Sequence, residues 1–340
     1  MATHLDSTTD VGTILEQLRR SRAETADFRA SAARVAAMNF VVFVDDPGHR
    51  AWVLERATAV ADKHPSRLIV LDSTEATNGV DVVTNVRESG ESTILNERVD
   101  IGVHALDYGA IVSLTQELSV PDIPTVLWWS GAHIIASRTF SGLAASAGTI
   151  LVDSSGKSRD EATIRDIAIF HERFPHVVLH DLAYMRLLPW QDMIAQFFDD
   201  PTLREDIFSL TALEIESGSD AEAFYLAGWL GSRLSWTARG RDAFVDRRGN
   251  TIPFTKIEVG DQRRVRSVVL RAPDSTYRAE ISDDDAGVVC LSVEGAKAKK
   301  IGCATLRNIA NTALIERAIL ENAREPIFET SLETVNELLG

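Results

Sequence analysis

Short polar motifs follow most of the apolar runs of this sequence, and they hold the side chains that could carry chemistry. Ligands of open α/β sheets bind beyond the carboxyl ends of the strands, so motifs at those ends would line a polar, acidic binding edge. Asp and Ser also cap the helices that follow such strands, and capping explains the same residue types without a ligand. The motifs are Asp45-Asp46, Asp72-Ser73, Trp128-Trp129-Ser130-Gly131, Asp153-Ser154-Ser155 and His180-Asp181.

Nucleotide-binding and nucleophile motifs are missing from these positions. The first strand is followed by Asp45-Asp46-Pro47-Gly48 in place of G-x-G-x-x-G, and its carboxylates would repel a pyrophosphate. Gly156-Lys157-Ser158 resembles the end of a phosphate-binding loop, but Leu151 stands where that loop needs its first glycine. No Ser or Cys lies in a G-x-S-x-G context. We therefore predict neither a catalytic residue nor a bound cofactor.

Histidine and cysteine spacing does not predict a metal site. His171, His176 and His180 lie close in sequence, but they match no recurrent ligand pattern. Cys290 falls on a predicted strand and Cys303 on the apolar stripe of a predicted helix, so core packing is the expectation for both. A redox pair would require the strand and the helix to bring the two Cα atoms within about 7 Å.

The elements that position these motifs alternate between strand and helix along the middle of the chain. Apolar runs predict buried strands, and stripes at helical spacing predict the helices between them. The alternation predicts a Rossmann-like α/β domain over residues 39–210, an open, mostly parallel sheet with helices on both faces. Residues 82–86 and 92–103 predict a hairpin or edge strands, and residues 14–37 predict helices within an N-terminal segment, 1–38. Strands are expected at 40–44, 67–71, 125–129, 149–152 and 177–179, and helices at 52–61, 111–118 and 164–168.

The pattern changes to α+β over residues 211–340. Tyr277 and Ala279 alternate with Arg278 and Glu280, which is typical of a strand with one buried and one exposed face. We expect an antiparallel meander, with strands at 255–259, 265–270, 276–281 and 288–293. The helices of this C-terminal domain are expected at 221–236, 301–322 and 330–339.

Composition excludes several classes of partner. Fifty acidic residues against 35 basic ones give a formal charge of −15, and such a surface repels nucleic acid and anionic lipid. The N-terminus shows no secretory signal, and no apolar run approaches the roughly 20 residues that cross a bilayer. Two cysteines are too few for a disulfide framework in a chain of this size. These observations predict a cytoplasmic protein.

Tryptophan and arginine are the usual carriers of binding energy at protein interfaces. Trp128 and Trp129 occupy successive strand positions, which point to opposite faces of a sheet. One of them can pack in the core, while the other faces a second layer, a partner or the strand-end edge. Trp190 follows Arg186 and Pro189 at the start of a helix, and we expect it to be partly buried.

Five segments of the sequence together resemble one known family, the glucose-6-phosphate dehydrogenase assembly proteins, OpcA. The resemblance is strong over residues 35–240 and weaker beyond them. The combination of PDIPTVLWW with a later L-x-P-W is the most specific part of it. The segments are His64-Pro65-Ser66-Arg67 leading into LIVLDS, VPDIPTVLWWSG (120–131), LVDSS (151–155), HDLAYMRLLPWQDMIAQFFDDP (180–201) and YLAGWLGSRLSW (225–236).

The resemblance implies a non-catalytic protein that binds glucose-6-phosphate dehydrogenase and promotes its assembly and activity, as an allosteric activator at the entry to the oxidative pentose phosphate pathway. It supplies no catalytic residue. In cyanobacterial relatives the effect is tied to thioredoxin, which makes thioredoxin a second candidate partner, although the two cysteines here lie in the weakly matched part. The candidate partner surface consists of His64, Ser66, Arg67, Trp128, Trp129, Asp153, Arg186 and Trp190.

A sugar-phosphate sensor or enzyme is the alternative function. It would use the strand-end edge as its binding site, with Arg67, Arg186 and His180 supplying the cationic groups that an anionic ligand needs.

Overall fold

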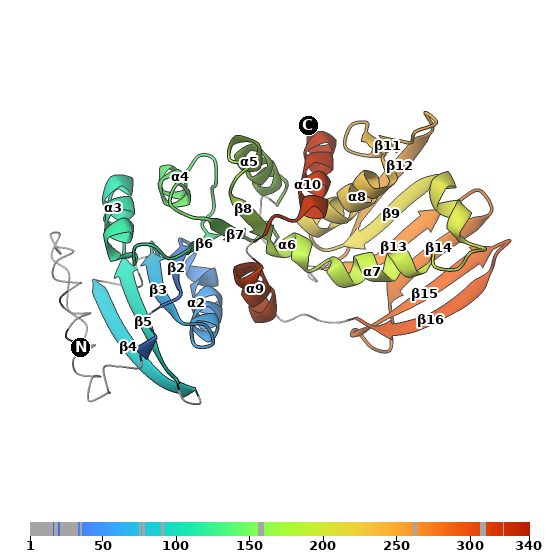
Figure 1. Cartoon of the computed structure of the whole chain (residues 1–340). Coiled ribbons are helices and arrows are strands. Elements are labelled where there is room, and N and C mark those ends of the chain that lie inside the picture. Colours follow the sequence, from blue (N-terminus) through green and yellow to red (C-terminus); the bar gives the residue numbers. More distant parts are fainter. Residues whose placement is uncertain are drawn as a thin grey trace. The chain divides into compact units, whose positions relative to one another are not determined.

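The computed structural model describes residues 36–74, 79–89, 92–155, 160–260, 264–306, 311–321 and 323–340, together with residues 16, 20, 33, 34 and 76. The chain folds into two compact units, each described here by itself (Figure 1). Unit 1 takes the described residues up to Val152 with Arg173–His180 and Asn311–Ala323, and unit 2 takes Asp153–Glu172, Asp181–Ala310 and Arg324–Gly340. The chain therefore passes between the units at several points, whereas the sequence suggests one passage near residue 210.

Unit 1 is built on a mostly parallel sheet in the order β1-β5-β3-β2-β6-β7-β8, with β4 paired to β5. The central strand β2 pairs in parallel with β3 on one side and with β6 on the other. The hairpin β4-β5 is antiparallel, as the sequence predicts. The strands are β1 (Ala33–Arg34), β2 (Met38–Val44), β3 (Ser66–Asp72), β4 (Val80–Ser89), β5 (Ser92–Gly102), β6 (Thr125–Ser130), β7 (Thr149–Val152) and β8 (Val178–Asp181), whose last residue belongs to unit 2.

Helices cover both faces of this sheet. Figure 1 shows α2 (Pro47–Ala61) and α9 (Asn311–Leu320) on one face, and α3 (Tyr108–Leu118) and α4 (Arg138–Ala144) on the other. All seven residues of β2 and of β3 are buried, because a central parallel strand is covered on both faces and must be apolar on both. The predicted Rossmann-like α/β architecture is therefore confirmed.

Unit 2 holds a second, largely antiparallel sheet in the order β10-β11-β12-β9-β13-β14-β15-β16. Only β9 and β12 pair in parallel, and β13 to β16 form the predicted antiparallel meander. Buried and less buried residues alternate along β9 and β15, as in a sheet with one covered face. The strands are β9 (Ala212–Ser217), β10 (Thr237–Ala238), β11 (Ala243–Val245), β12 (Thr251–Glu258), β13 (Val265–Arg271), β14 (Ser275–Ile281), β15 (Val288–Gly295) and β16 (Lys299–Thr305).

Two long helices of unit 2 pack closely against each other, α8 (Asp220–Leu234) and α10 (Pro326–Leu339). Gly228 allows this approach, because a Cβ there would overlap Val335 and come within 2.8 Å of the Ser331 carbonyl oxygen. The other helices are α5 (Asp160–Arg173), whose last residue belongs to unit 1, α6 (Leu182–Met185), α7 (Leu188–Gln196) and the 3₁₀ helix η1 (Arg204–Ser209).

Two predicted elements are wrong in part and several others were missed. The helix expected at 301–322 begins only at Asn311, and residues 301–305 belong to the edge strand β16. Over so short a run, the apolar positions of β16 fit both the helical and the strand periodicity. The pairing with β15 makes this segment a strand. The short helix α4 and the strands β9, β10 and β11 have no counterpart in the sequence prediction. Of the helices predicted at 14–37, the structure describes residues 16, 20, 33, 34, 36 and 37, and Ala33–Arg34 form the strand β1 in place of a helix, because they pair with β5. The Gly156-Lys157-Ser158 segment lies outside the described residues.

Candidate functional site

The carboxyl ends of β2 and β6 form the switch point of the first sheet, where α/β proteins bind their ligands. The Asp45 carboxylate (Oδ2) accepts a hydrogen bond from the Ala132 backbone N–H at 2.9 Å, which joins the two strand-end loops. Asp46 caps α2 by accepting from the Gly48 N–H at 2.8 Å. Carboxylates therefore stand where dinucleotide-binding proteins present glycine N–H groups to a pyrophosphate, and their charge would repel a phosphate.

Asp72, at the end of β3, is fully buried and also bound within the chain. Its Oδ2 accepts from Arg50 Nε at 2.5 Å, and its Oδ1 accepts from the backbone and the hydroxyl of Thr74 at 2.9 and 2.6 Å. Helix capping thus accounts for Asp46. The Asp72 carboxylate stabilises the turn that follows β3.

Three of the predicted partner-surface residues lie at the opposite, amino end of β3. Arg67 is buried and donates to Glu97 Oε2 from Nε at 2.9 Å and from Nη2 at 2.7 Å, and to the Leu118 carbonyl at 2.6 Å. Ser66 is fully buried and His64 is half-buried. Arg67 joins β3 to β5 and to the end of α3, so the structure supports a role for this side chain in holding the fold.

The three candidate tryptophans are all interior, which agrees with the core and second-layer alternatives for Trp128 and Trp129 and leaves none of the three as an exposed contact. Trp128 is 1% exposed, Trp129 is 2% exposed and Trp190 is 4% exposed. Trp129 stacks on Phe43 with ring centroids 4.1 Å apart. Both faces of β6 are covered by helices, so the two neighbouring indoles of this strand each pack in a different layer of the core.

The other two predicted residues, Asp153 and Arg186, meet in a buried polar cluster of unit 2. The guanidinium of Arg186 binds Asp153 in a bidentate manner, with Nη2–Oδ1 at 2.7 Å and Nη1–Oδ2 at 3.1 Å. Its Nε donates to Glu222 Oε1 on α8 at 3.0 Å, and its Nη2 also contacts the Ser155 hydroxyl. Glu222 Oε2 in turn accepts from the Val265 N–H of β13 at 3.3 Å. The Arg186 side chain thereby joins Asp153 to α8, and Glu222 joins α8 to the second sheet.

Asp181 extends this cluster from the end of β8. Its Oδ1 accepts from the backbone N–H groups of Ser154 at 3.1 Å and Ala183 at 2.9 Å, the second of which caps α6. Its Oδ2 accepts from the hydroxyl of Tyr225 on α8 at 2.8 Å. Sequence reasoning missed Tyr225 and Glu222 as members of the cluster. Their signal is the three-residue spacing that places both on one face of a helix.

The electrostatics of the cluster follow from three carboxylates, two of which bind the guanidinium of Arg186. Burial, followed by the charge of Asp153, raises the pKa of Asp181 to about 6. Burial also raises the pKa of Glu222. Burial opposes ionisation of Asp153 too, but the charge and hydrogen bonds of Arg186 outweigh it and lower the pKa of Asp153. Arg186 itself stays charged, because Asp153 and Glu222 raise its pKa despite burial. The cluster can hold a proton near neutral pH, and its guanidinium is already bound by two protein carboxylates.

His180 does not act with Asp181 as a base and its orienting partner. Successive strand residues point to opposite faces, and His180 Nε2 lies 3.2 Å from the Glu321 carbonyl oxygen. Burial lowers the pKa of His180, so the ring is neutral at pH 7. Among the described residues, no three His, Cys, Asp or Glu side chains gather as metal ligands. None of the described helices is long and apolar enough to cross a bilayer.

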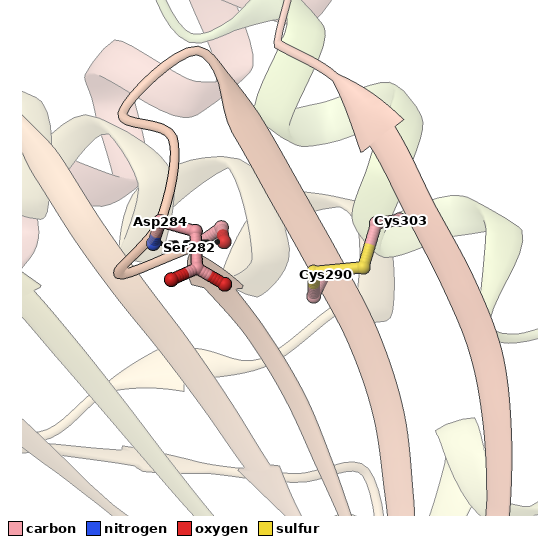
Figure 2. The surroundings of a disulfide bond; sticks show 4 residues. All are labelled: Ser282, Asp284, Cys290 and Cys303. Atoms are coloured by element: carbon pink, nitrogen blue, oxygen red, sulfur yellow. Dashed lines mark hydrogen bonds between the residues drawn. A yellow bond between two sulfur atoms is a disulfide. The ribbon is translucent and has the colours of Figure 1, made fainter.

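The two cysteines form a disulfide across the edge of the second sheet (Figure 2). Cys290 on β15 lies directly opposite Cys303 on β16, with 4.0 Å between their Cα atoms. Cys303 is exposed and Cys290 is half-buried. The expectation that both cysteines merely pack in the core is wrong, because residues 301–305 form a strand rather than a helix. The distance condition stated for a redox pair is met.

Two sequence profiles cover most of the chain. Residues 57–169 match the profile described as the glucose-6-phosphate dehydrogenase subunit N-terminal domain, OpcA_G6PD_assem. Residues 177–332 match the corresponding C-terminal domain, OpcA_G6PD_C. The chain belongs to the OpcA family. The resemblance found from the sequence motifs is confirmed, and the C-terminal part, where the motifs are weaker, is included.

Three cyanobacterial members of the family are longer than the stretch that this chain matches. The OxPP cycle protein OpcA of Nostoc punctiforme is 24% identical over 310 residues, which are 81% of this chain and 65% of that protein. The OpcA proteins of Synechocystis and Synechococcus elongatus are 29% and 27% identical over 53% and 63% of this chain. The chain spans only 39% and 49% of those two relatives.

Solved structures share the fold at low sequence identity. A 3-ketoreductase from Actinomadura kijaniata, in complex with TDP-benzene and NADP, superimposes with a TM-score of 0.50 at 12% identity, over 89% of this chain and 96% of that one. An NADPH-dependent oxidoreductase from Desulfitobacterium hafniense gives a TM-score of 0.50 at 9% identity, over 89% and 94%. This likeness concerns the arrangement of an α/β sheet followed by a largely antiparallel one.

Proposed function

We propose that this protein is a non-catalytic subunit that binds glucose-6-phosphate dehydrogenase and activates it allosterically in the oxidative pentose phosphate pathway. The observation that carries the proposal is the match of both family domains, each described as a subunit domain of that dehydrogenase. To activate, the protein must bind the active state of the dehydrogenase more tightly than its other states. A tenfold gain in apparent substrate affinity needs about 1.4 kcal/mol of coupling.

The chemistry of the strand ends supports a role without catalysis. At the switch point Asp45 and Asp46 hydrogen-bond backbone N–H groups of the chain itself, and Asp72 binds Arg50. A scaffold of the oxidoreductase type whose switch point carries its own carboxylates is poorly suited to hold the pyrophosphate of a dinucleotide.

The alternative, a sugar-phosphate sensor or enzyme, finds no support in the positions of its three cations. Arg67 is bound to Glu97, Arg186 is bound to Asp153 and Glu222, and His180 faces a carbonyl oxygen. The two guanidiniums could bind a phosphate only after breaking buried ion pairs, which costs several kcal/mol.

The proposal is tested by titrating the purified chain into the glucose-6-phosphate dehydrogenase of the same organism, while reaction velocity and particle mass are followed together. We expect a complex at micromolar concentration or below, with a changed kcat or KM for glucose 6-phosphate. The control is the same titration with a dehydrogenase that uses another sugar. Unchanged kinetics without a complex would refute the proposal, and so would turnover of glucose 6-phosphate by the chain alone.

Thioredoxin is the second proposed partner, and the disulfide favours it. Disulfides of cytoplasmic proteins are usually redox-active rather than permanent, so the expected cytoplasmic location fits a Cys290–Cys303 bond that is opened and closed. Cys303 is exposed on an edge strand, where a thiolate can reach it. Incubation with reduced thioredoxin should release two thiols per chain, and the Cys290→Ser/Cys303→Ser variant should release none. A bond that survives excess thioredoxin would exclude this partner.

A further inference from the structure

The loop after β5 carries a fully exposed segment at the carboxyl edge of the first sheet. Every residue from His104 to Ala110 is exposed, and two of them are large and apolar. Leu106 is 36% exposed and Tyr108 is 42% exposed. Large apolar side chains that are exposed close together mark interaction sites more often than single ones do.

The segment is ordered by its own hydrogen bonds. The Leu106 N–H donates to the Val103 carbonyl at 3.0 Å, and the Asp107 carboxylate caps α3 by accepting from the Ala110 N–H at 2.9 Å. A fixed backbone loses little conformational entropy when a partner binds. The exposed Leu106 and Tyr108 side chains are therefore presented in a preorganised form.

Arg138, the first residue of α4, is held against Tyr108. Its Nη2 donates to the Tyr108 hydroxyl at 2.7 Å, and its guanidinium carbon lies 4.0 Å from the centre of the tyrosine ring. Figure 1 shows α3 and α4 side by side on the same face of the sheet. The guanidinium is exposed, and among the described residues it has no carboxylate partner. Tyrosine and arginine are enriched among the residues that dominate binding energy at interfaces.

The charge of this surface differs from that of the molecule as a whole. The chain carries a formal charge of −15, whereas Arg138 places an exposed cation on this surface. Arg138 offers two N–H groups of a planar fork that an external carboxylate can bind. Asp107, the acidic residue between Leu106 and Tyr108, is engaged as the cap of α3. The surface thus complements an acidic side chain that has an apolar neighbour.

We propose that Leu106, Tyr108 and Arg138 form the centre of the surface that binds the dehydrogenase, and that an Asp or Glu of the dehydrogenase binds Arg138 while an apolar side chain beside it packs on Leu106 and Tyr108. This inference rests on the proposed function and gives it a location. The surface lies within the matched N-terminal domain, residues 57–169, and it uses none of the buried tryptophans.

The test measures the affinity and activation of the dehydrogenase by three variants, Tyr108→Ala, Arg138→Glu and Arg138→Lys. Tyr108→Ala and Arg138→Glu should each weaken binding at least tenfold. Arg138→Lys keeps the charge but loses the planar fork, so an intermediate loss is expected. Added salt should slow association of the wild type more than that of Arg138→Glu. Both substituted side chains are exposed, and the melting temperature of each variant confirms that it is folded.

Matched controls come from exposed residues of unit 2. Phe208 is 62% exposed, and Arg248 lies in the exposed turn between β11 and β12. Phe208→Ala and Arg248→Glu should leave the affinity within twofold.

If the wild type binds but Tyr108→Ala and Arg138→Glu bind equally well, this inference is overturned and the proposed function stands. Failure of the wild type to bind refutes the proposed function itself. Loss of self-association in the variants, with dehydrogenase binding unchanged, would assign the surface to a second copy and also overturn the inference.

Discussion

Replacing Asp181 by Asn should make the stability of unit 2 less dependent on pH. The pKa of Asp181 is raised to about 6 in the folded chain, whereas a free Asp titrates near 3.9. The folded state therefore binds more protons than the unfolded state between these values, and the free energy of unfolding falls as pH rises from about 4 to beyond 6. At about 1.4 kcal/mol per pKa unit, ionised Asp181 costs the fold about 3 kcal/mol.

The substitution isolates this ionisation. Asn keeps the Oδ1 acceptor for the N–H groups of Ser154 and Ala183, and its amide can donate to the Tyr225 oxygen in place of accepting from it. Any cost of the new hydrogen bond is independent of pH and cancels in a comparison across pH. Relative to the wild type, Asp181→Asn should gain about 1 kcal/mol between pH 5 and pH 8, since part of the 3 kcal/mol falls below pH 5.

The assay is urea unfolding of both proteins at half-unit pH steps from 5 to 8, followed by circular dichroism and by tryptophan fluorescence. Tyr225→Phe is the matched control, because removing its hydroxyl takes a hydrogen bond from the ionised carboxylate and should raise the pKa of Asp181 further. A difference between wild type and Asp181→Asn that stays constant across this range would show that Asp181 does not titrate near 6.

Three further changes test the packing of unit 2. Arg186→Met leaves Asp153 and Glu222 buried without their cation and should lower the free energy of unfolding by about 3–5 kcal/mol; a loss below 1 kcal/mol in urea unfolding would mean that the cluster admits water. Gly228→Ala should destabilise by about 1–3 kcal/mol, because the new methyl group overlaps Val335 of α10; an unchanged melting temperature would show that the two helices can move apart. Reducing the Cys290–Cys303 disulfide opens a loop with a sequence separation of 13 and should cost at most about 3 kcal/mol; hydrogen exchange should then increase in β15 and β16, and an increase spread over the whole second sheet would contradict an edge role.

The architecture of the first sheet could be predicted because its signal is local. The run Phe40–Val44 and the later apolar runs are buried on both faces, so each is continuous in sequence and ends at a capping or turn residue. The edge strand β16 lacks that signal. Its residues 301–305 are only partly buried, and pairing with β15, which no local pattern records, makes them a strand. The same pairing brings Cys290 and Cys303 together, so the disulfide was missed along with the strand.

The candidate site was predicted less well, because residue type alone does not determine exposure. Trp128 and Trp129 were chosen for their interface chemistry, yet a strand covered by helices on both faces buries both of its neighbouring side chains. Asp153 and Arg186 lie together near the strand ends, and Glu222, from a distant helix, accepts from the Nε of the same guanidinium. Leu106 lies in the loop after β5 and Tyr108 begins α3. This stretch has no strand-end motif, and only the fold shows that both side chains stay exposed.

The return of α9 to unit 1 has a consequence for biosynthesis. This helix buries Leu314, Ile315 and Ala318 and is anchored by the ion pair between Lys63 and Glu316. About 160 residues separate Val152 from Asn311 (311 − 152 = 159), so at 5–20 residues per second the emerging chain leaves the α9-binding face of its first sheet bare for roughly 8–30 seconds. During that interval the nascent polypeptide exposes an apolar surface to the ribosome-associated chaperones, and a messenger truncated before codon 311 would yield a product that never covers it.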